Sequence, residues 1–414
     1  MTKTRSNWGP LVILMVNMFI TMVGMGLIIP ILPKFMTELG ARGQDMGYLV
    51  AAMGVTQLIF SPIGGEMSDK YGRKFMIVLG IGVFTLSQLL FGLADQMWLL
   101  YVSRLLSGIG AALLAPAMMA YVADITLEEE RGKGLGLFSA SMSLGVVIGP
   151  GIGGFLAEYG LRVPFYVATA VAGVSVLLSL LFLPETQSRE ARHLARTSEK
   201  KRESLLKQLL SSFRAPYFML LLLVFMMTFG LMNFESVISL YVDVKHGFTP
   251  KDISLMITFG ALAGVFTQAV LFERLLRRFS ERQILIAMFL LSAVMMLAIL
   301  VTKTYVSVFA VTILFFVATT LIRPAVNTLL SKMAGNEQGF VAGMNNAYMS
   351  LGTIAGPSIA GVLFDVNVDY PYVLGAVVMV ASTVMLIRWR ESSDRHKQAG
   401  IPAQVKEGAA AARE

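Results

Sequence analysis

Residues 145–157 read GVVIGPGIGGFLA, and residues 352–364, which lie 207 positions later, read GTIAGPSIAGVLF. The two stretches share glycines, a proline and two aliphatic residues at the same places. The same offset pairs residues on both sides of them: Gly132 with Gly339, Gly136 with Gly343, and Pro164 with Pro371. Self-similarity of this kind indicates that the chain is an internal duplication of two halves.

Each half contains six apolar stretches that are long enough to cross a bilayer as helices. A hydrocarbon core of about 30 Å needs about 20 apolar residues, and a helix satisfies its own backbone hydrogen bonds there. The predicted spans are residues 11–31, 47–66, 75–94, 98–122, 135–157, 163–183, 216–241, 253–272, 283–302, 305–327, 340–364 and 371–389. They predict an all-α polytopic membrane protein with twelve transmembrane helices in two six-helix bundles.

The spans divide the chain into four predicted parts. Residues 1–183 form the first bundle, 184–214 a basic cytoplasmic linker, 215–391 the second bundle, and 392–414 a polar tail that we expect to be disordered. Two interpretations of the linker stay open. It is either a flexible connection that helps to orient the chain, or it contains a specific site for anionic lipid.

The composition excludes a soluble protein. Hydrophobic residues make up 56% of the chain and charged residues only 14%, whereas soluble domains carry about 25% charged residues. Such a chain has too little polar surface to cover itself in water. The chain contains no cysteine, so disulfides and thiolate metal sites are excluded, and no metal site is expected.

The net charge of +8 does not indicate nucleic-acid binding, because its distribution follows the topology. Most of the 34 Lys and Arg residues fall in the segments that share a side with both termini. Basic residues concentrate on the cytoplasmic side of membrane proteins. We therefore predict a multi-pass protein of the cell membrane, a bacterial plasma membrane, with both termini in the cytoplasm.

Two parallel repeats favour a transporter over other membrane proteins. Such repeats place a substrate site near the midplane between the halves and move it by rocking one half against the other. A static scaffold remains the alternative. Neither a charge ring typical of a channel nor a catalytic motif typical of an enzyme occurs. No phosphate-binding loop occurs either, so we expect no ATP site or other cofactor, and a proton gradient as the energy source.

The loop between the second and third spans carries a motif that includes Gly65, Asp69, Gly72 and Arg73. Gly72 permits a tight turn, and Asp69 stands at the end of the second helix, where it can pair with a cation. With this loop the sequence resembles the major facilitator superfamily, over essentially the whole chain. The resemblance implies that these four residues help to hold the cytoplasmic side closed during conformational change.

The fifth span resembles the motif of antiporters in that family. Gly145, Gly149 and Gly153 share one helix face, which permits close helix approach, and Pro150 can kink the helix. Simple tight packing is the alternative. The resemblance implies that these residues and Gly154 form a hinge that limits leakage between access states.

Ionisable groups inside a membrane are costly and therefore mark candidate functional sites. Glu235 is the one carboxylate well inside a predicted span, and a low dielectric favours its neutral form. It could carry a proton or hold a cationic substrate. Competition between the two for one carboxylate is sufficient to exchange substrate for protons. Arg104 lies in a motif that resembles the family's membrane arginine motif, and it would tune the pKa of Glu235 or the conformational state. A structural ion pair between Glu235 and Arg104 is the alternative.

A closer resemblance is to twelve-span drug:proton antiporters, namely Gram-positive multidrug efflux pumps that export quinolones and dyes. It rests on residues 234–241, 322–325 and 335–340, although Thr320 stands where some relatives carry a second carboxylate. The resemblance implies a monomer that exports lipophilic, often cationic compounds in exchange for protons. A proton-coupled transporter of one metabolite, such as a sugar or polyamine, is the alternative.

A polyspecific pocket needs adaptable apolar walls, for which the chain's 27 methionines are suited. Depth along the spans selects the candidates. The predicted substrate-binding residues are Asn17, Met22, Gln57, Phe234, Glu235, Ile257, Phe316, Arg323 and Asn345.

Overall fold

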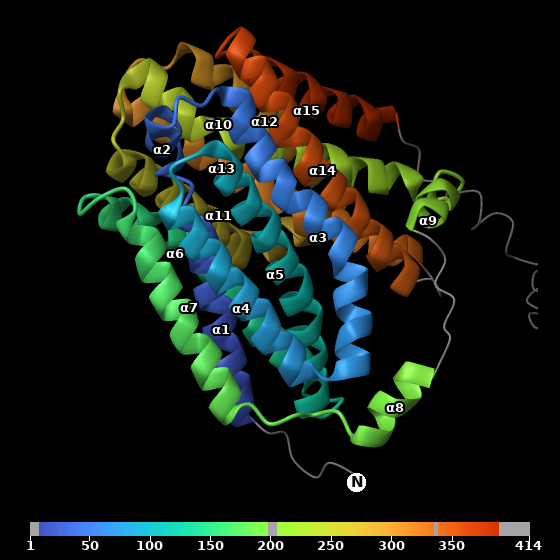
Figure 1. The fold of residues 1–414 in the computed structure, drawn as a ribbon. Helices are drawn as coiled ribbons and strands as arrows, with labels where there is room; N and C mark the ends of the chain where they lie inside the picture. Colours follow the sequence, from blue (N-terminus) through green and yellow to red (C-terminus); the bar gives the residue numbers. More distant parts are fainter. Residues whose placement is uncertain (1–7, 198–204, 335–337, 389–414) are drawn as a thin grey trace, which may run out of the picture.

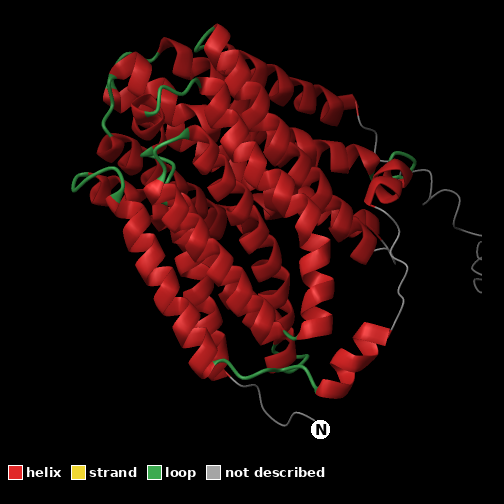
Figure 2. Cartoon of the chain, viewed as in Figure 1, coloured by secondary structure: helices red, strands yellow, loops and turns green. Residues whose placement is uncertain are grey.

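The computed structural model describes residues 8–197, 205–334 and 338–388, and every regular element in these ranges is an α-helix (Figures 1 and 2). Within these described ranges, twelve helices are long and apolar enough to cross a membrane. They are α1 (Trp8–Gly26), α3 (Gly43–Tyr71), α4 (Arg73–Leu93), α5 (Met97–Ile125), α6 (Arg131–Ala157), α7 (Val163–Phe182), α10 (Phe218–His246), α11 (Pro250–Arg278), α12 (Glu281–Val301), α13 (Tyr305–Ala334), α14 (Gln338–Val366) and α15 (Tyr370–Arg388). The predicted fold class is confirmed.

Several helices extend beyond the spans that hydropathy predicts. α3 continues to Tyr71, and α11 continues to Arg278, because polar residues can extend a helix beyond the apolar core. The first helix is an exception, since it ends at Gly26 rather than near residue 31. The chain turns there, and a short helix, α2 (Leu32–Glu38), begins with a proline in its first turn.

The segment predicted as a linker contains two further helices, α8 (Arg189–Thr197) and α9 (Leu205–Ser212). Its remaining part, residues 198–204, lies outside the described residues, and so does the predicted tail at 392–414.

The long helices form two groups. α1 and α3 to α7 pack around buried clusters that contain Leu14, Tyr121 and Phe35, whereas α10 to α15 pack around one cluster that contains Phe234 and Phe289. Between the groups, α3 contacts α14, and α6 contacts α11. The two groups lie close together at the top of Figure 1 and are further apart at its lower right.

Two names describe the ends of this bundle. The linker end is the end at which α3 finishes at Tyr71, α4 begins at Arg73 and α8 lies. The far end is the end at which α3 begins at Gly43 and α14 finishes at Val366.

Candidate functional site

Glu235 lies in the far half of α10, partly buried, and no ion pair or hydrogen bond joins its side chain to another described residue. Its helix is held firmly on either side of it. The Asn233 amide donates to the Pro371 carbonyl at 2.6 Å, and the Phe234 ring stacks on Phe315 with centroids 3.9 Å apart. A carboxylate without a charged partner therefore stands on a fixed helix.

Arg104 is buried on α5, with 6% of its surface exposed. Its guanidinium lies over the Phe91 ring at 4.9 Å, and its Nε has no hydrogen-bond partner among the described residues. The arrangement is a cation–π contact in an apolar setting. The ion pair between Arg104 and Glu235, the structural alternative from the sequence, is not formed.

The far side of Glu235 is closed by contacts between the two groups. Leu240, five residues further along α10, packs against the apolar cluster of the first group that contains Ile31 and Phe35. Ile29, just after α1, packs against the core of the second group. At 1.5 Å per residue, Glu235 lies about 7 Å on the linker side of this layer.

α3 and α14 meet at the far end through a carboxylate and two helix ends. Asp365 accepts the backbone N–H of Gly43 at 2.7 Å and that of Gln44 at 2.9 Å. Gly47 lies so close to the Pro357 carbonyl that no side chain would fit between them. The free N–H groups of a helix's first turn and its dipole both favour a carboxylate there.

α6 and α11 make the equivalent contact. Glu158 pairs with Lys251 at 2.8 Å, and Gly154 lies directly against Ser254. The offset of 207 residues relates Glu158 to Asp365 and Lys251 to Gln44. The repeat has therefore placed a carboxylate at both crossings of the far end, although its partners differ.

The same helix faces are exposed towards the linker end. Gly136 and Ala140 on α6, and Gly343 and Asn346 on α14, are exposed, and a Cβ added to either glycine would meet no atom within 4 Å. The two groups are therefore in contact at the far end, whereas these helix faces are exposed towards the linker end.

The glycine motif of α6 divides between two faces. Gly145 and Gly149 face α1, where an added Cβ would lie 2.7 Å from the Phe19 carbonyl oxygen and 2.9 Å from that of Val23. Gly153 lies against Leu27, the residue after α1, and Pro150 packs on Gly26 at the same crossing.

Gly154, by contrast, faces α11 across the boundary between the groups. The second half repeats this division, with Gly352 and Gly356 against α10 and Gly361 against α3. The predicted shared face is confirmed, whereas the hinge role stays a prediction.

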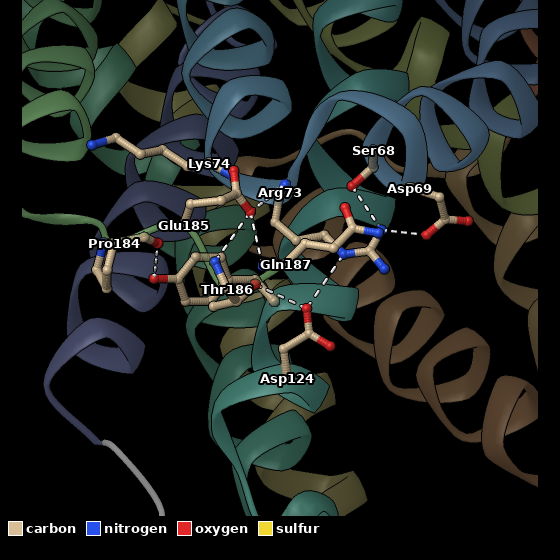
Figure 3. Close-up of polar contacts among 10 residues, drawn as sticks. Ser68, Asp69, Arg73, Lys74, Asp124, Pro184, Glu185, Thr186 and Gln187 are labelled. Carbon is tan, nitrogen blue, oxygen red and sulfur yellow. Dashed lines mark hydrogen bonds and ion pairs between the residues drawn. The ribbon is translucent and has the colours of Figure 1, made fainter. Parts of the chain in front are cut away.

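The predicted loop motif forms a polar cluster at the linker end (Figure 3). Arg73 Nη1 pairs with Asp69 at 2.6 Å and donates to Ser68 at 3.0 Å, while its Nε approaches Asp124 of α5 at 3.4 Å. Gly72 has φ +108°, and a Cβ there would collide with the Glu185 carboxylate. Gly72 is therefore required both by its backbone conformation and by close contact.

Glu185 and Asp124 are the members of this cluster that sequence reasoning missed. Glu185 accepts the backbone N–H groups of Arg73 and Lys74, at 2.9 and 3.2 Å, which belong to the first turn of α4. Asp124 also accepts the Thr186 hydroxyl at 2.9 Å. One signal could have found Glu185, namely an acidic residue at the start of an otherwise basic segment.

Gly65, the remaining residue of the predicted motif, faces Pro116 of α5 at an ordinary contact distance. It takes no part in the polar cluster.

The second half contains the counterpart of the Arg73–Asp124 pair with the charges exchanged. An offset of 208 residues, which relates α4 to α12 and α5 to α13, leads from Arg73 to Glu281 and from Asp124 to Lys332. Glu281 and Lys332 form an ion pair. The duplication has preserved this contact while reversing its sign.

Two predicted pocket residues lie at helix crossings within the first group. Asn17 donates to the Ser179 hydroxyl of α7 at 2.7 Å and is 1% exposed, whereas Met22 packs against Gly145. Gln57 is partly buried on α3.

Three others lie in the core of the second group: Phe234, Ile257 and Phe316. In this conformation these side chains fill the interior of the group, so their substrate role stays a prediction.

Arg323 and Asn345 are brought together. Arg323 Nη2 and Asn345 Nδ2 lie 3.9 and 3.8 Å from the Met349 sulfur, and Arg323 has no carboxylate partner among the described residues. A cation, an amide and an adaptable thioether therefore meet where α13 and α14 cross.

A comparison with protein families decides the identity of this architecture. The model of the Major Facilitator Superfamily matches residues 14–271 and 220–411. The chain belongs to the Major Facilitator Superfamily. It is therefore a multi-pass membrane transporter, and the resemblance noted from its motifs is confirmed.

Relatives within the family include two bacterial proteins. "Multidrug resistance protein 2" of Bacillus subtilis (strain 168) is 43% identical over 92% of this chain and 96% of its own length. "Quinolone resistance protein NorA" of Staphylococcus aureus (strain COL) is 34% identical over 91% of this chain and 95% of its own length. The predicted resemblance to Gram-positive multidrug efflux pumps is confirmed.

Solved structures share the fold at low sequence identity. A bacterial homolog of the human lysosomal transporter Spinster, in an inward-facing and occupied conformation, has a TM-score of 0.68 at 15% identity, covering 91% of this chain and 94% of its own. The nucleoside transporter NupG has a TM-score of 0.71 at 11% identity, and the match covers 92% of this chain and 100% of NupG.

Proposed function

We propose that this transporter exports lipophilic, often cationic drugs and dyes in exchange for protons, with its linker end in the cytoplasm. The orientation follows from the excess of Lys and Arg in the segments at that end. The names of the relatives favour multidrug export over transport of one metabolite. In this orientation, the structure corresponds to a state open to the cytoplasm.

The observation that carries the proposal is the unpaired carboxylate of Glu235 beside the closed far end. A proton and a cationic substrate both neutralise a carboxylate in a low dielectric, so each displaces the other. In the state open to the cytoplasm, Glu235 releases its proton and accepts the substrate. When the far end opens, a proton from outside displaces the substrate.

In this proposal Arg104 raises the cost of a second positive charge in the membrane interior, because its guanidinium lies over the Phe91 ring and its Nε has no partner among the described residues. This cost prevents proton and cationic substrate from binding together. The transporter works as a monomer in this proposal, with the proton gradient as its energy source and no bound cofactor.

Dye uptake into inside-out vesicles tests the proposal. The wild-type protein should accumulate a cationic dye when the vesicle interior is acidified, and a protonophore should abolish the uptake. Glu235→Gln should abolish it as well. Asp243→Asn, which removes a carboxylate from the same helix nearer the far end, is the matched control and should retain uptake. Equal uptake by Glu235→Gln and wild type would exclude the carboxylate role.

Competition tests the breadth of substrates. Unlabelled drugs of unrelated structure should each inhibit uptake of the dye. Inhibition by only one chemical class would instead support a transporter of a dedicated metabolite.

A further inference from the structure

A groove of about 420 Å³ lies on the first group at the linker end, outside the site described above. It is formed by the end of α3, the first turns of α4, the last turn of α7 and the helix α8. Its lining residues are Tyr71, Lys74, Phe75, Val78, Leu180, Glu185 and Arg192. Four of these are largely apolar, and three are charged, so the groove is amphipathic.

The three charged side chains differ in how many hydrogen-bond partners they already have. Glu185 accepts backbone N–H groups, including those of Thr186 and Gln187 at 3.1 and 3.2 Å. Lys74 donates to the Leu180 carbonyl at 2.7 Å and keeps further donors. The Arg192 side chain makes no hydrogen bond or ion pair with a described residue, and its Nε is buried without a partner. A guanidinium in that position lacks an acceptor.

α8 is held in place, so Arg192 is presented to the groove in a defined position. Arg196, one turn later, donates from Nε to the Lys70 carbonyl at 2.9 Å. Its guanidinium also lies 5.1 Å from the centroid of the Tyr71 ring. Residues four apart share one face of a helix, so these contacts direct Arg192 towards the same side.

The position of the groove along the membrane normal indicates that lipid surrounds its apolar part. α4 begins at Arg73 and α7 ends at Phe182, so the groove lies where the two spans leave the membrane. Phe75 and Leu180 are 52% and 48% exposed, on helices that traverse the bilayer. An acyl chain can lie along these side chains, while a phosphate reaches Arg192 and Lys74.

We propose that this groove binds one anionic phospholipid of the leaflet at the linker end. The phosphate accepts from Arg192 and Lys74, because guanidinium and ammonium groups are the usual partners of phosphate. Arg196, a further exposed cation on the same side of α8, favours a net negative lipid over a zwitterionic one. A cationic transport substrate is disfavoured by the same charges. The location in the cytoplasmic leaflet rests on the proposed orientation, whereas the binding itself does not.

Native mass spectrometry of the full-length protein tests the site. The protein is released from nanodiscs of phosphatidylcholine and phosphatidylglycerol in equal amounts, and the lipid retained per protein is counted. Wild type should retain one phosphatidylglycerol preferentially. Arg192→Gln should reduce this retention about fivefold, the factor for about 1 kcal/mol per basic residue at an anionic surface. Arg192→Lys should keep most of it.

Arg189→Gln is the matched control. It removes the same charge from the same helix at an exposed residue outside the groove, so it should retain the lipid as wild type does. Equal retention by Arg192→Gln would overturn the proposal, as would equal retention of phosphatidylcholine. Complete displacement by inorganic phosphate would show that the groove binds free phosphate instead. Lipid retention is measured without transport, so failure of the antiport proposal leaves this result unaffected.

Discussion

Asp365, near the end of α14, accepts the backbone N–H of Gln44 in the first turn of α3 at 2.9 Å. One helix of the second group therefore caps a helix of the first group, and this bond exists only while the far end is closed. Opening the far end leaves the N–H groups of that first turn to water. Asp365 thus contributes to the stability of the closed far end at this crossing.

Asp365→Ala should shift the transporter towards states that are open at the far end. Loss of a capping carboxylate costs about 1 kcal/mol, which corresponds to about a fivefold change in population. Spin labels on cysteines at Tyr159 and Val306 can report the change, because both residues are exposed, at 81% and 75%, and belong to different groups. The chain has no other cysteine to label.

The expected result for Asp365→Ala is a larger fraction of long distances between these labels. Glu38→Ala, an exposed acidic residue of α2 at the same end, should leave the distances unchanged. Identical distance distributions in Asp365→Ala and wild type would show that the cap does not control this equilibrium.

The ion pair between Glu158 and Lys251 should contribute less, because both side chains are nearly half exposed. Exposed pairs contribute about 0.2–1 kcal/mol. Lys251→Glu places two carboxylates together and should populate long distances between the same labels. Adding Glu158→Lys should restore the wild-type distribution. High salt should weaken both effects, and a double variant no better than the single one would contradict a direct pairing.

Asp124→Asn should destabilise the polar cluster at the linker end. The Arg73 side chain is only 13% exposed, and a buried charged group that loses a partner costs about 1–3 kcal/mol. The thermal midpoint of the purified protein should therefore fall. Lys332→Gln interrupts the equivalent pair of the second half and leaves Glu281, whose side chain is 17% exposed, without this partner, so its midpoint should fall as well. An unchanged midpoint in either variant would contradict the argument.

Gly72→Ala should lower the same thermal midpoint, because the backbone has φ +108° and the new Cβ would displace Glu185. An extended conformation with positive φ is adopted almost only by glycine and costs a residue with a side chain about 1–3 kcal/mol. Gly136→Ala is the matched control, since its Cβ enters open space within α6, where alanine favours the helix. A midpoint for Gly72→Ala at or above that of Gly136→Ala would refute the argument.

Sequence reasoning found Glu235, Arg104 and the loop motif because membrane burial makes charged residues conspicuous and glycines mark turns. It missed Asp124, because an acidic residue at a helix end has an ordinary explanation as a surface charge. Its partner Arg73 lies 51 residues earlier, and only packing of α4 against α5 brings the two together. Short helices such as α8 were missed because they contain no apolar stretch from which they could be predicted.

The sequence alone determined the number of spans, the two-fold repeat and the family, because these depend on hydropathy and local spacing. The tertiary structure alone decided which contacts join the halves. Gly149 and Gly154 belong to one motif, yet the first packs against α1 inside its own group and the second against α11 of the other. Which end of the bundle is closed was likewise decided only by the tertiary structure. Contacts between distant helices depend on how two preformed bundles rest against each other, and one sequence supports more than one such arrangement.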